Sequence, residues 1–125
     1  MGDRGVIECV ERNGGVVYLY THWRAHELTT VVADGLANGI SRWGDESYLN
    51  RILFDTLTGL EGQTEGFGIA TWCPGDAYLK ITVDHERQTV QVFSRDFGDE
   101  WLPGTEEYGF DEFVRAMKDP EVLSL

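Results

Sequence analysis

The stretch from Val16 to His26 constrains the fold most, because its pattern changes from that of a strand to that of a helix start. Its first half alternates between two kinds of side chain, which is the two-residue period of a β-strand. One face is apolar and the other carries two tyrosines and a histidine: Val17, Leu19 and Thr21 against Tyr18, Tyr20 and His22. Trp23, Arg24 and His26 follow where a helix is expected to begin. This strand-to-helix turn is therefore the first candidate for a functional site.

Other alternating segments predict the rest of a sheet. Residues 5–11 and 15–22 predict a β-hairpin around Asn13-Gly14, a pair typical of a tight type I′ turn. Three more strands are predicted at residues 66–73, 77–84 and 89–94. Gly66 and Gly68 leave one face of the first of these bare, so that a ring or a ligand can lie against its backbone.

Two segments carry the three- and four-residue spacing of amphipathic helices. They cover residues 27–43 and 45–59, and a third, shorter helix is predicted at residues 110–118. Gly35 and Gly39 lie four residues apart in the first helix, a spacing that permits close approach of another backbone. The order β-β-α-α-β-β-β-α predicts an α+β domain over residues 1–125. Its sheet is mostly antiparallel with about five strands, and the two consecutive helices pack on one face.

The charge of the chain limits its partners. There are 22 acidic residues against 10 basic ones, giving a net charge of −12. This balance argues against direct binding to nucleic acid or to anionic membranes, which needs a basic surface. Seven acids and no base occur in the loop 96–112. The loop is either a solvated surface or a surface that imitates nucleic acid toward a basic protein. Its candidate partner-binding residues are Asp99, Glu100, Trp101, Glu106 and Glu107.

The sequence also indicates the cellular compartment and the state of the two cysteines. The N-terminus lacks the apolar segment of a secretory signal, and no apolar run is long enough to span a bilayer. We therefore expect a cytoplasmic protein, or one of the host cytoplasm if a phage encodes it. Cys9 and Cys73 lie in strand-like segments and are expected to be small buried side chains. A disulfide between them remains open at this point.

No catalytic motif is present, and neither a metal nor a cofactor is expected. His22 and His26 would form a metal pair only on a continuous helix, and the helix is expected to start at or after Ala25. Arginines in this apolar region are a stronger signal, because a guanidinium there needs a carboxylate or an anion. If the two long helices pack back on the sheet, Arg24, Arg42 and Arg51 could converge near the turn. The candidate ligand-binding residues are Tyr18, Tyr20, His22, Trp23, Arg24, His26, Arg42 and Arg51.

Several segments together resemble a family of small, mostly uncharacterised proteins of bacterial and phage genomes. They are the opening Met1-Gly2-Asp3-Arg4, the run Tyr18-Leu19-Tyr20-Thr21-His22-Trp23, the segment Arg42-Trp43 with Tyr48-Leu49-x-Arg51-Ile52, and Gly66-Phe67-Gly68-Ile69. The resemblance covers roughly the first ninety residues and brings no established activity or catalytic residue. A phage setting suggests, by analogy, a protein that blunts a host defence.

Three functions follow from these observations. The first is a non-catalytic binding protein that sequesters a small anionic, nucleotide-like ligand. A homo-oligomer would give such a small domain a deeper pocket at the shared interface. The second is an acidic, nucleic-acid-mimicking inhibitor of a basic host protein. The third is a small hydrolase that uses His22 or His26.

Overall fold

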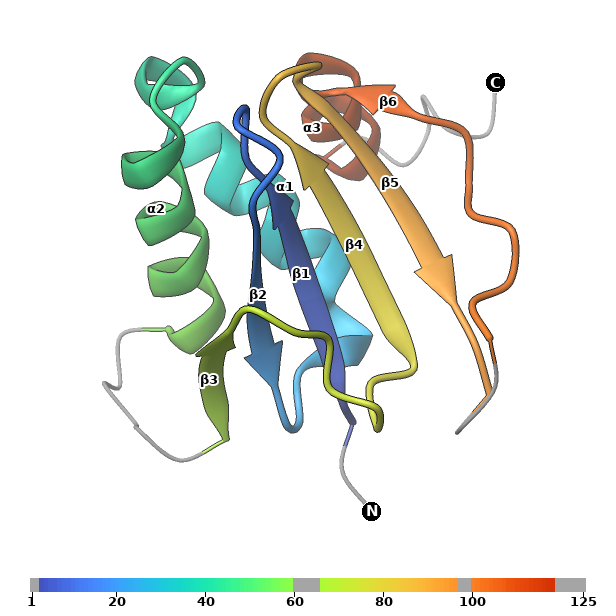
Figure 1. Ribbon diagram of the computed structural model, residues 1–125. Coiled ribbons are helices and arrows are strands. Elements are labelled where there is room, and N and C mark those ends of the chain that lie inside the picture. Colours follow the sequence, from blue (N-terminus) through green and yellow to red (C-terminus); the bar gives the residue numbers. More distant parts are fainter. Residues whose placement is uncertain (1–2, 60–65, 97–99, 119–125) are drawn as a thin grey trace.

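The N-terminal hairpin and two later strands form the centre of a six-stranded sheet (Figure 1). The computed structural model describes residues 3–59, 66–96 and 100–118 of the chain. Its strands are β1 (Gly5–Val10), β2 (Val16–Thr21), β3 (Phe67–Ala70), β4 (Leu79–Asp84), β5 (Thr89–Ser94) and β6 (Tyr108–Gly109). Its helices are α1 (Leu28–Asn38), α2 (Glu46–Thr58) and α3 (Phe110–Lys118), with 3₁₀ turns η1 (Ala25–Glu27) and η2 (Ile40–Arg42). The predicted α+β fold class is confirmed.

The strand order is β3-β2-β1-β4-β5-β6, and the sheet is mixed. Every neighbouring pair is antiparallel except β1 and β4, which are parallel. The chain reaches this arrangement because the connection after β3 crosses in front of β2 and β1 before it enters β4 (Figure 1). The sequence predicted five strands. The sixth, β6, is only two residues long and lies in the segment expected to be a loop.

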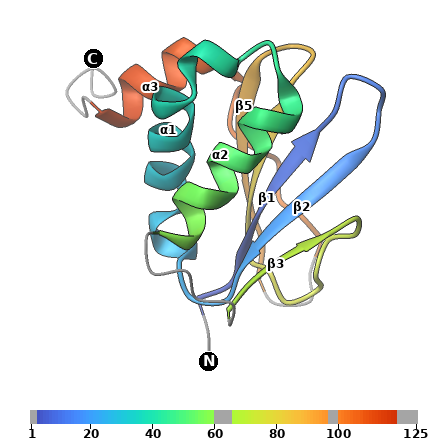
Figure 2. The same ribbon diagram turned by 90° about the vertical axis from the view of Figure 1, so that its left-hand side faces the viewer.

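The helices cover one face of the sheet, opposite the crossing connection (Figure 2). Alternate residues of the central strands point toward them, and Ile7, Leu19 and Ile81 are fully or almost fully buried there. Gly35 in α1 and Gly39 just after it both lie against α2, a close approach that their spacing in the sequence permits. A Cβ at Gly35 would lie 2.8 Å from Leu53 Cδ2, and one at Gly39 would lie 2.8 Å from Leu49 Cδ1.

Two local predictions need correction. In the β1–β2 turn Gly14 has a φ of +89° but Asn13 does not have a positive φ, so the turn is not of type I′. Asn13 instead accepts a hydrogen bond from Gly15 N through its side chain at 2.9 Å. The helix predicted at residues 27–43 is also interrupted, since α1 ends at Asn38 and a separate 3₁₀ turn, η2, follows. The acidic segment is irregular over residues 100–107, as predicted for a loop, but its backbone is tied to β5. Leu102 N and Thr105 N donate to the β5 residues Ser94 and Val92, each at 2.9 Å.

The two cysteines are both free thiols. Cys9 is buried in the core between the sheet and the helices, whereas Cys73 lies in the connection that crosses the opposite face. Burial raises the pKa of the Cys9 thiol. Within the described residues no helix has the length and apolar character needed to cross a membrane.

Candidate functional site

Thr21 organises the turn between β2 and η1. Its side chain is fully buried, and its Oγ1 accepts hydrogen bonds from Arg24 N at 3.0 Å and from Trp23 N at 3.4 Å. A threonine that ends a strand in this way bends the chain without leaving the backbone donors unpaired. The predicted cluster therefore exists, but its side chains leave the turn in different directions.

Arg24 points to the helices and not to the open face of the sheet. Its Nη1 donates to Leu57 O at 2.7 Å and to Thr56 O at 3.3 Å, and its Nε donates to Glu27 at 2.7 Å. These contacts place a cation at the C-terminal end of α2, where the carbonyl groups lack helical partners. The hydrogen bond from Arg24 lowers the pKa of Glu27. The apolar surroundings of Arg24 are thus explained by a structural role.

The other two arginines lie away from the turn. Arg42 lies at the opposite end of α2, 4.7 Å from the ring centroid of Tyr48 and 3.9 Å from Asp45. Arg51 is exposed on α2 and pairs with Asp55 at 3.0 Å. The three guanidinium groups that the sequence placed together do not converge. The helices do pack on the sheet, but each arginine meets a group on its own or a neighbouring helix.

The two histidines and Trp23 occupy the end of the sheet near the N-terminus. His22 Nε2 lies 3.3 Å from Arg4 Nη2, and the His22 ring meets the edge of Trp23 with centroids 5.7 Å apart. Trp23 also packs on Phe67 and fills the space that a side chain at residue 66 would need. His26 pairs with Asp3 on the surface. Among the described residues no cluster of three or more His, Cys, Asp or Glu side chains could hold a metal.

Tyr18 and Tyr20 extend from β2 on the face opposite the helices. Tyr18 donates to Glu8 at 2.8 Å, and Glu8 also accepts from Thr82 at 2.8 Å. Burial and the hydrogen bond to Glu8 raise the pKa of Tyr18, so the phenol stays protonated. Tyr18 therefore belongs to a polar network within the sheet, whereas Tyr20 lines a groove.

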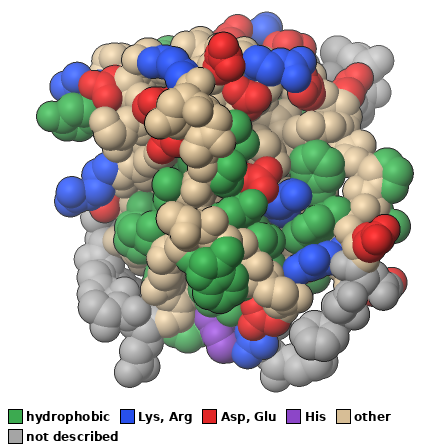
Figure 3. All heavy atoms as spheres, in the orientation of Figure 1, with side chains coloured by type: hydrophobic (Ala, Val, Ile, Leu, Met, Phe, Trp, Pro, Cys, Tyr) green, Lys and Arg blue, Asp and Glu red, His purple; other side chains and the backbone are tan. Residues whose placement is uncertain are grey.

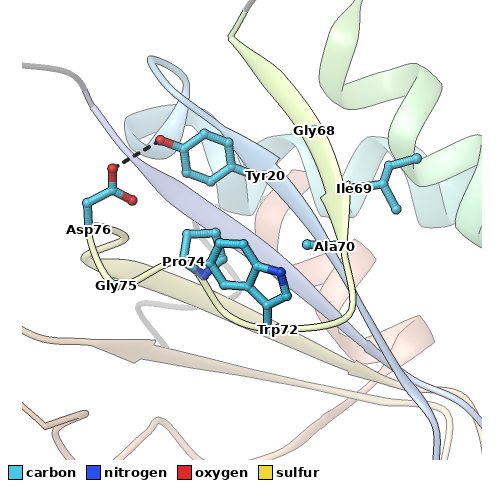
Figure 4. A pocket seen from close by; sticks show the side chains of 8 residues that line it. All are labelled: Tyr20, Gly68, Ile69, Ala70, Trp72, Pro74, Gly75 and Asp76. Carbon is cyan, nitrogen blue, oxygen red and sulfur yellow. Dashed lines mark hydrogen bonds between the residues drawn. The ribbon is translucent and has the colours of Figure 1, made fainter.

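The groove lies between the end of the sheet and the connection that follows β3 (Figure 4). Its volume is about 410 Å³. Tyr20 and Trp72 stand at its sides, Gly68 and Ala70 form its floor, and Ile69 points away from it (Figure 4). The remaining lining residues are Pro74, Gly75 and Asp76. A Cβ at Gly68 would meet no atom within 4 Å, so the floor is open to a ligand.

The polar end of the groove is formed by Asp76. Its Oδ2 accepts from Arg4 Nη1 at 2.9 Å and from the Tyr20 hydroxyl at 3.4 Å. Burial, followed by the charge of Asp76, raises the pKa of Tyr20, so this hydroxyl also remains a donor. Arg4 balances the carboxylate, which leaves the groove with one oriented acceptor and little net charge.

Sequence reasoning identified Tyr20 and the bare face at Gly68 but missed Trp72 and Asp76. Trp72 was assigned to the predicted strand 66–73 and Asp76 to the turn after it, so neither stood out by local pattern. A signal was nevertheless present, because a strand with a glycine on its open face and a tryptophan shortly after it can build a shallow aromatic site.

Residues 100–107 of the acidic segment run beside β5, at the edge of the sheet opposite β3 (Figure 1). Acidic and basic side chains are interspersed over this face of the molecule (Figure 3). Trp101 packs between two cations, 4.8 Å from Lys80 Nζ and 4.1 Å from Arg95 Cζ. Glu107 pairs with Arg87, and Glu100 and Glu106 are exposed. Asp99 lies outside the described residues. A role for these acids in binding a basic protein stays a prediction.

Comparisons with known proteins identified no similar protein. No family model matches the chain, and neither curated proteins nor solved structures give a match. The function is therefore inferred from the geometry of the groove.

Proposed function

We propose that this chain is a non-catalytic binding protein that holds the planar ring of a nucleoside-like or nucleotide-like ligand in the groove between Tyr20 and Trp72. The observation that carries this proposal is the pair of aromatic side chains beside a floor of bare backbone at Gly68 and Ala70. A volume of about 410 Å³ lies within the range of small-molecule sites.

The chemistry of the lining favours a flat, polar ring. Aromatic side chains stack on nucleobases, and each such contact contributes about 1–3 kcal/mol. The carboxylate of Asp76 supplies a hydrogen-bond acceptor for an exocyclic amino group at one end of the groove. Because Arg24, Arg42 and Arg51 lie elsewhere, the proposal concerns the ring of the ligand and no longer assigns those arginines to its phosphate.

The lining also favours binding over turnover. The described residues that line the groove include no Ser, Thr, Cys, Lys or His, the usual nucleophiles and general bases apart from carboxylates. Asp76 is the one carboxylate among them, and Arg4 and Tyr20 hold it as a hydrogen-bond acceptor. Sequestration of a ligand is the function that such a groove can perform. In a phage setting this would be the removal of a nucleotide signal.

Native mass spectrometry tests the proposal. The purified protein is incubated with the four ribonucleosides and their 5′-monophosphates, and a retained mass is expected for at least one of them. Tyr20→Ala and Trp72→Ala are each expected to weaken retention by about tenfold or more, because each removes one stacking surface.

Tyr48→Ala is the matched control, since Tyr48 is an exposed aromatic residue on α2 outside the groove. It is expected to retain the ligand like the wild-type protein. If the wild-type protein retains none of the eight compounds, or if both groove variants bind as well as Tyr48→Ala, the proposed function is wrong.

A further inference from the structure

Strand β3 forms an edge of the sheet and carries unpaired backbone groups. The register pairs Tyr20 with Gly68, and His22 N donates to Gly66 O at 2.7 Å. In an antiparallel pair only alternate residues exchange hydrogen bonds with a given neighbour. Gly66, Gly68 and Ala70 therefore face β2, and the N–H and C=O groups of Phe67 and Ile69 point outward. Within the described part of the chain β3 pairs with no strand other than β2.

This edge lacks the protection that sheet edges usually have. Soluble proteins commonly place charged residues on edge strands to prevent pairing with another chain. From Gly66 to Gly75 there is no charged residue, although 26% of the whole chain is charged. The side chains next to the edge are also apolar and open, because Ile69 is 62% exposed and Trp72 is 65% exposed.

The charge of the protein limits where a second copy can bind. Two copies that each carry a net charge of −12 repel one another, so they can meet closely only where the surface is uncharged. The edge at β3 is such a surface. A four-residue strand also gives few hydrogen bonds to a foreign peptide, whereas a symmetric pair uses every contact twice.

We propose that β3 pairs antiparallel with β3 of a second copy around a two-fold axis at Ile69. In this register Ile69 lies opposite Ile69 of the second copy, and Gly68 lies opposite Ala70. Opposite residues then share a face of the sheet, as antiparallel pairing requires. The outward backbone groups of Phe67 and Ile69 fall at hydrogen-bonding positions.

This pairing also completes the groove, a consequence that rests on the proposed function. Trp72 lies two residues beyond Ala70 and on the same face as Gly68. In the paired sheet Trp72 of the second copy, which lies in the bend after β3, comes to the Gly66 end of the first copy's strand, near the bare backbone of Gly68. The groove, which is open on its outer side in one copy, then gains an aromatic wall from the other.

Sedimentation velocity tests the pairing without any ligand. The wild-type protein is expected to sediment as a dimer and Ile69→Lys as a monomer, because a lysine opposite its own copy places two like charges together. Ile40→Lys is the matched control, since Ile40 is 65% exposed but lies in η2. A monomeric wild-type protein, or a dimeric Ile69→Lys, would overturn the pairing.

Oxidative cross-linking checks the register. Ile69→Cys is expected to form a covalent dimer that reductant reverses, whereas Ile40→Cys is expected to stay monomeric on a reducing-agent-free gel. Equal cross-linking of both variants would exclude an axis at Ile69.

The contribution to the groove is measured separately, with adenosine as the probe. Adenosine is expected to bind Ile69→Lys about tenfold more weakly than Ile40→Lys, the loss of one stacking contact. A dimer that binds no adenosine would leave the pairing intact and count against the proposed function. Equal affinities would overturn only the shared wall.

Discussion

At the scale of single residues, Arg24 shows how a side chain that looks functional in the sequence can be structural. An arginine among apolar residues needs an anionic or carbonyl partner. The sequence left the partner open, and the fold supplies two carbonyl groups at the end of α2 and the carboxylate of Glu27. The sequence correctly indicated that the Arg24 guanidinium has a polar partner, but that partner is part of the protein and not an anionic ligand.

Arg24→Ala is therefore expected to lower the free energy of unfolding by about 1.5–3 kcal/mol, because it removes charge-assisted hydrogen bonds to Thr56 and Leu57. Urea denaturation measures the effect. Arg51→Ala is the control, since Arg51 is an exposed partner of Asp55 and should change stability by less than about 0.5 kcal/mol. Equal effects of the two variants would contradict the capping role.

At the scale of secondary-structure elements, the glycines of α1 determine how closely the two long helices pack. A Cβ at Gly35 would lie 2.8 Å from Leu53 Cδ2, which is too close for two carbon atoms. Leu53 is fully buried, so its side chain has little room to move away. The contact between α1 and α2 therefore depends on the absence of a Cβ at this position.

Gly35→Ala is expected to destabilise the protein even though alanine favours a helix by about 1 kcal/mol. Overpacking of a filled core costs about 1–3 kcal/mol and should exceed that gain. The midpoint of urea unfolding is the measurement. Gly44→Ala is the control, because a Cβ there meets nothing within 4 Å. A rise in the midpoint for Gly35→Ala would mean that the helices can separate without loss.

At the scale of the whole molecule, one buried histidine joins three parts of the fold. His85 is fully buried in the turn between β4 and β5, and its backbone N–H donates to Val10 O at 3.0 Å. Its Nε2 lies 2.6 Å from Asn50 Oδ1 on α2, and Asn50 donates in turn to Glu11 at 2.9 Å. Burial lowers the pKa of His85, more than the nearby carboxylates of Glu46 and Asp84 raise it.

This lowered pKa predicts a loss of stability in mild acid. In the unfolded chain His85 takes up a proton near its usual pKa of about 6.5, whereas in the folded chain it does so only at lower pH. Protonation therefore stabilises the unfolded state relative to the folded state as the pH falls below about 6.5. The free energy of unfolding is expected to decrease between about pH 7.5 and about pH 5.5. His85→Asn should reduce the pH dependence of the free energy of unfolding, whether or not the variant is itself less stable than the wild-type protein.

Urea denaturation at each pH measures the slope. His26→Asn is the control, because His26 is exposed and its replacement leaves the contribution of His85 in place. If His85→Asn has the same pH dependence as the wild-type protein, another group is responsible.

The sequence by itself determined the elements that depend on local pattern. Alternation and helical spacing predicted the order of strands and helices. The spacing of apolar side chains in a strand or a helix is set by the backbone geometry of that element alone. The C-terminal helix was predicted at 110–118 and α3 spans Phe110–Lys118. The bare strand face at Gly68 was also predicted, and the glycine spacing at Gly35 permitted the close helix contact that the structure has, since both follow from a missing Cβ.

Only the tertiary structure decided which elements became neighbours. The parallel pairing of β1 with β4 joins residues that are more than seventy positions apart, and no local period encodes it. The same crossing connection brings Trp72 and Asp76 to Tyr20 and so creates the groove. Packing likewise directed Arg24 to the end of α2, where the carbonyl groups of Thr56 and Leu57 accept its hydrogen bonds.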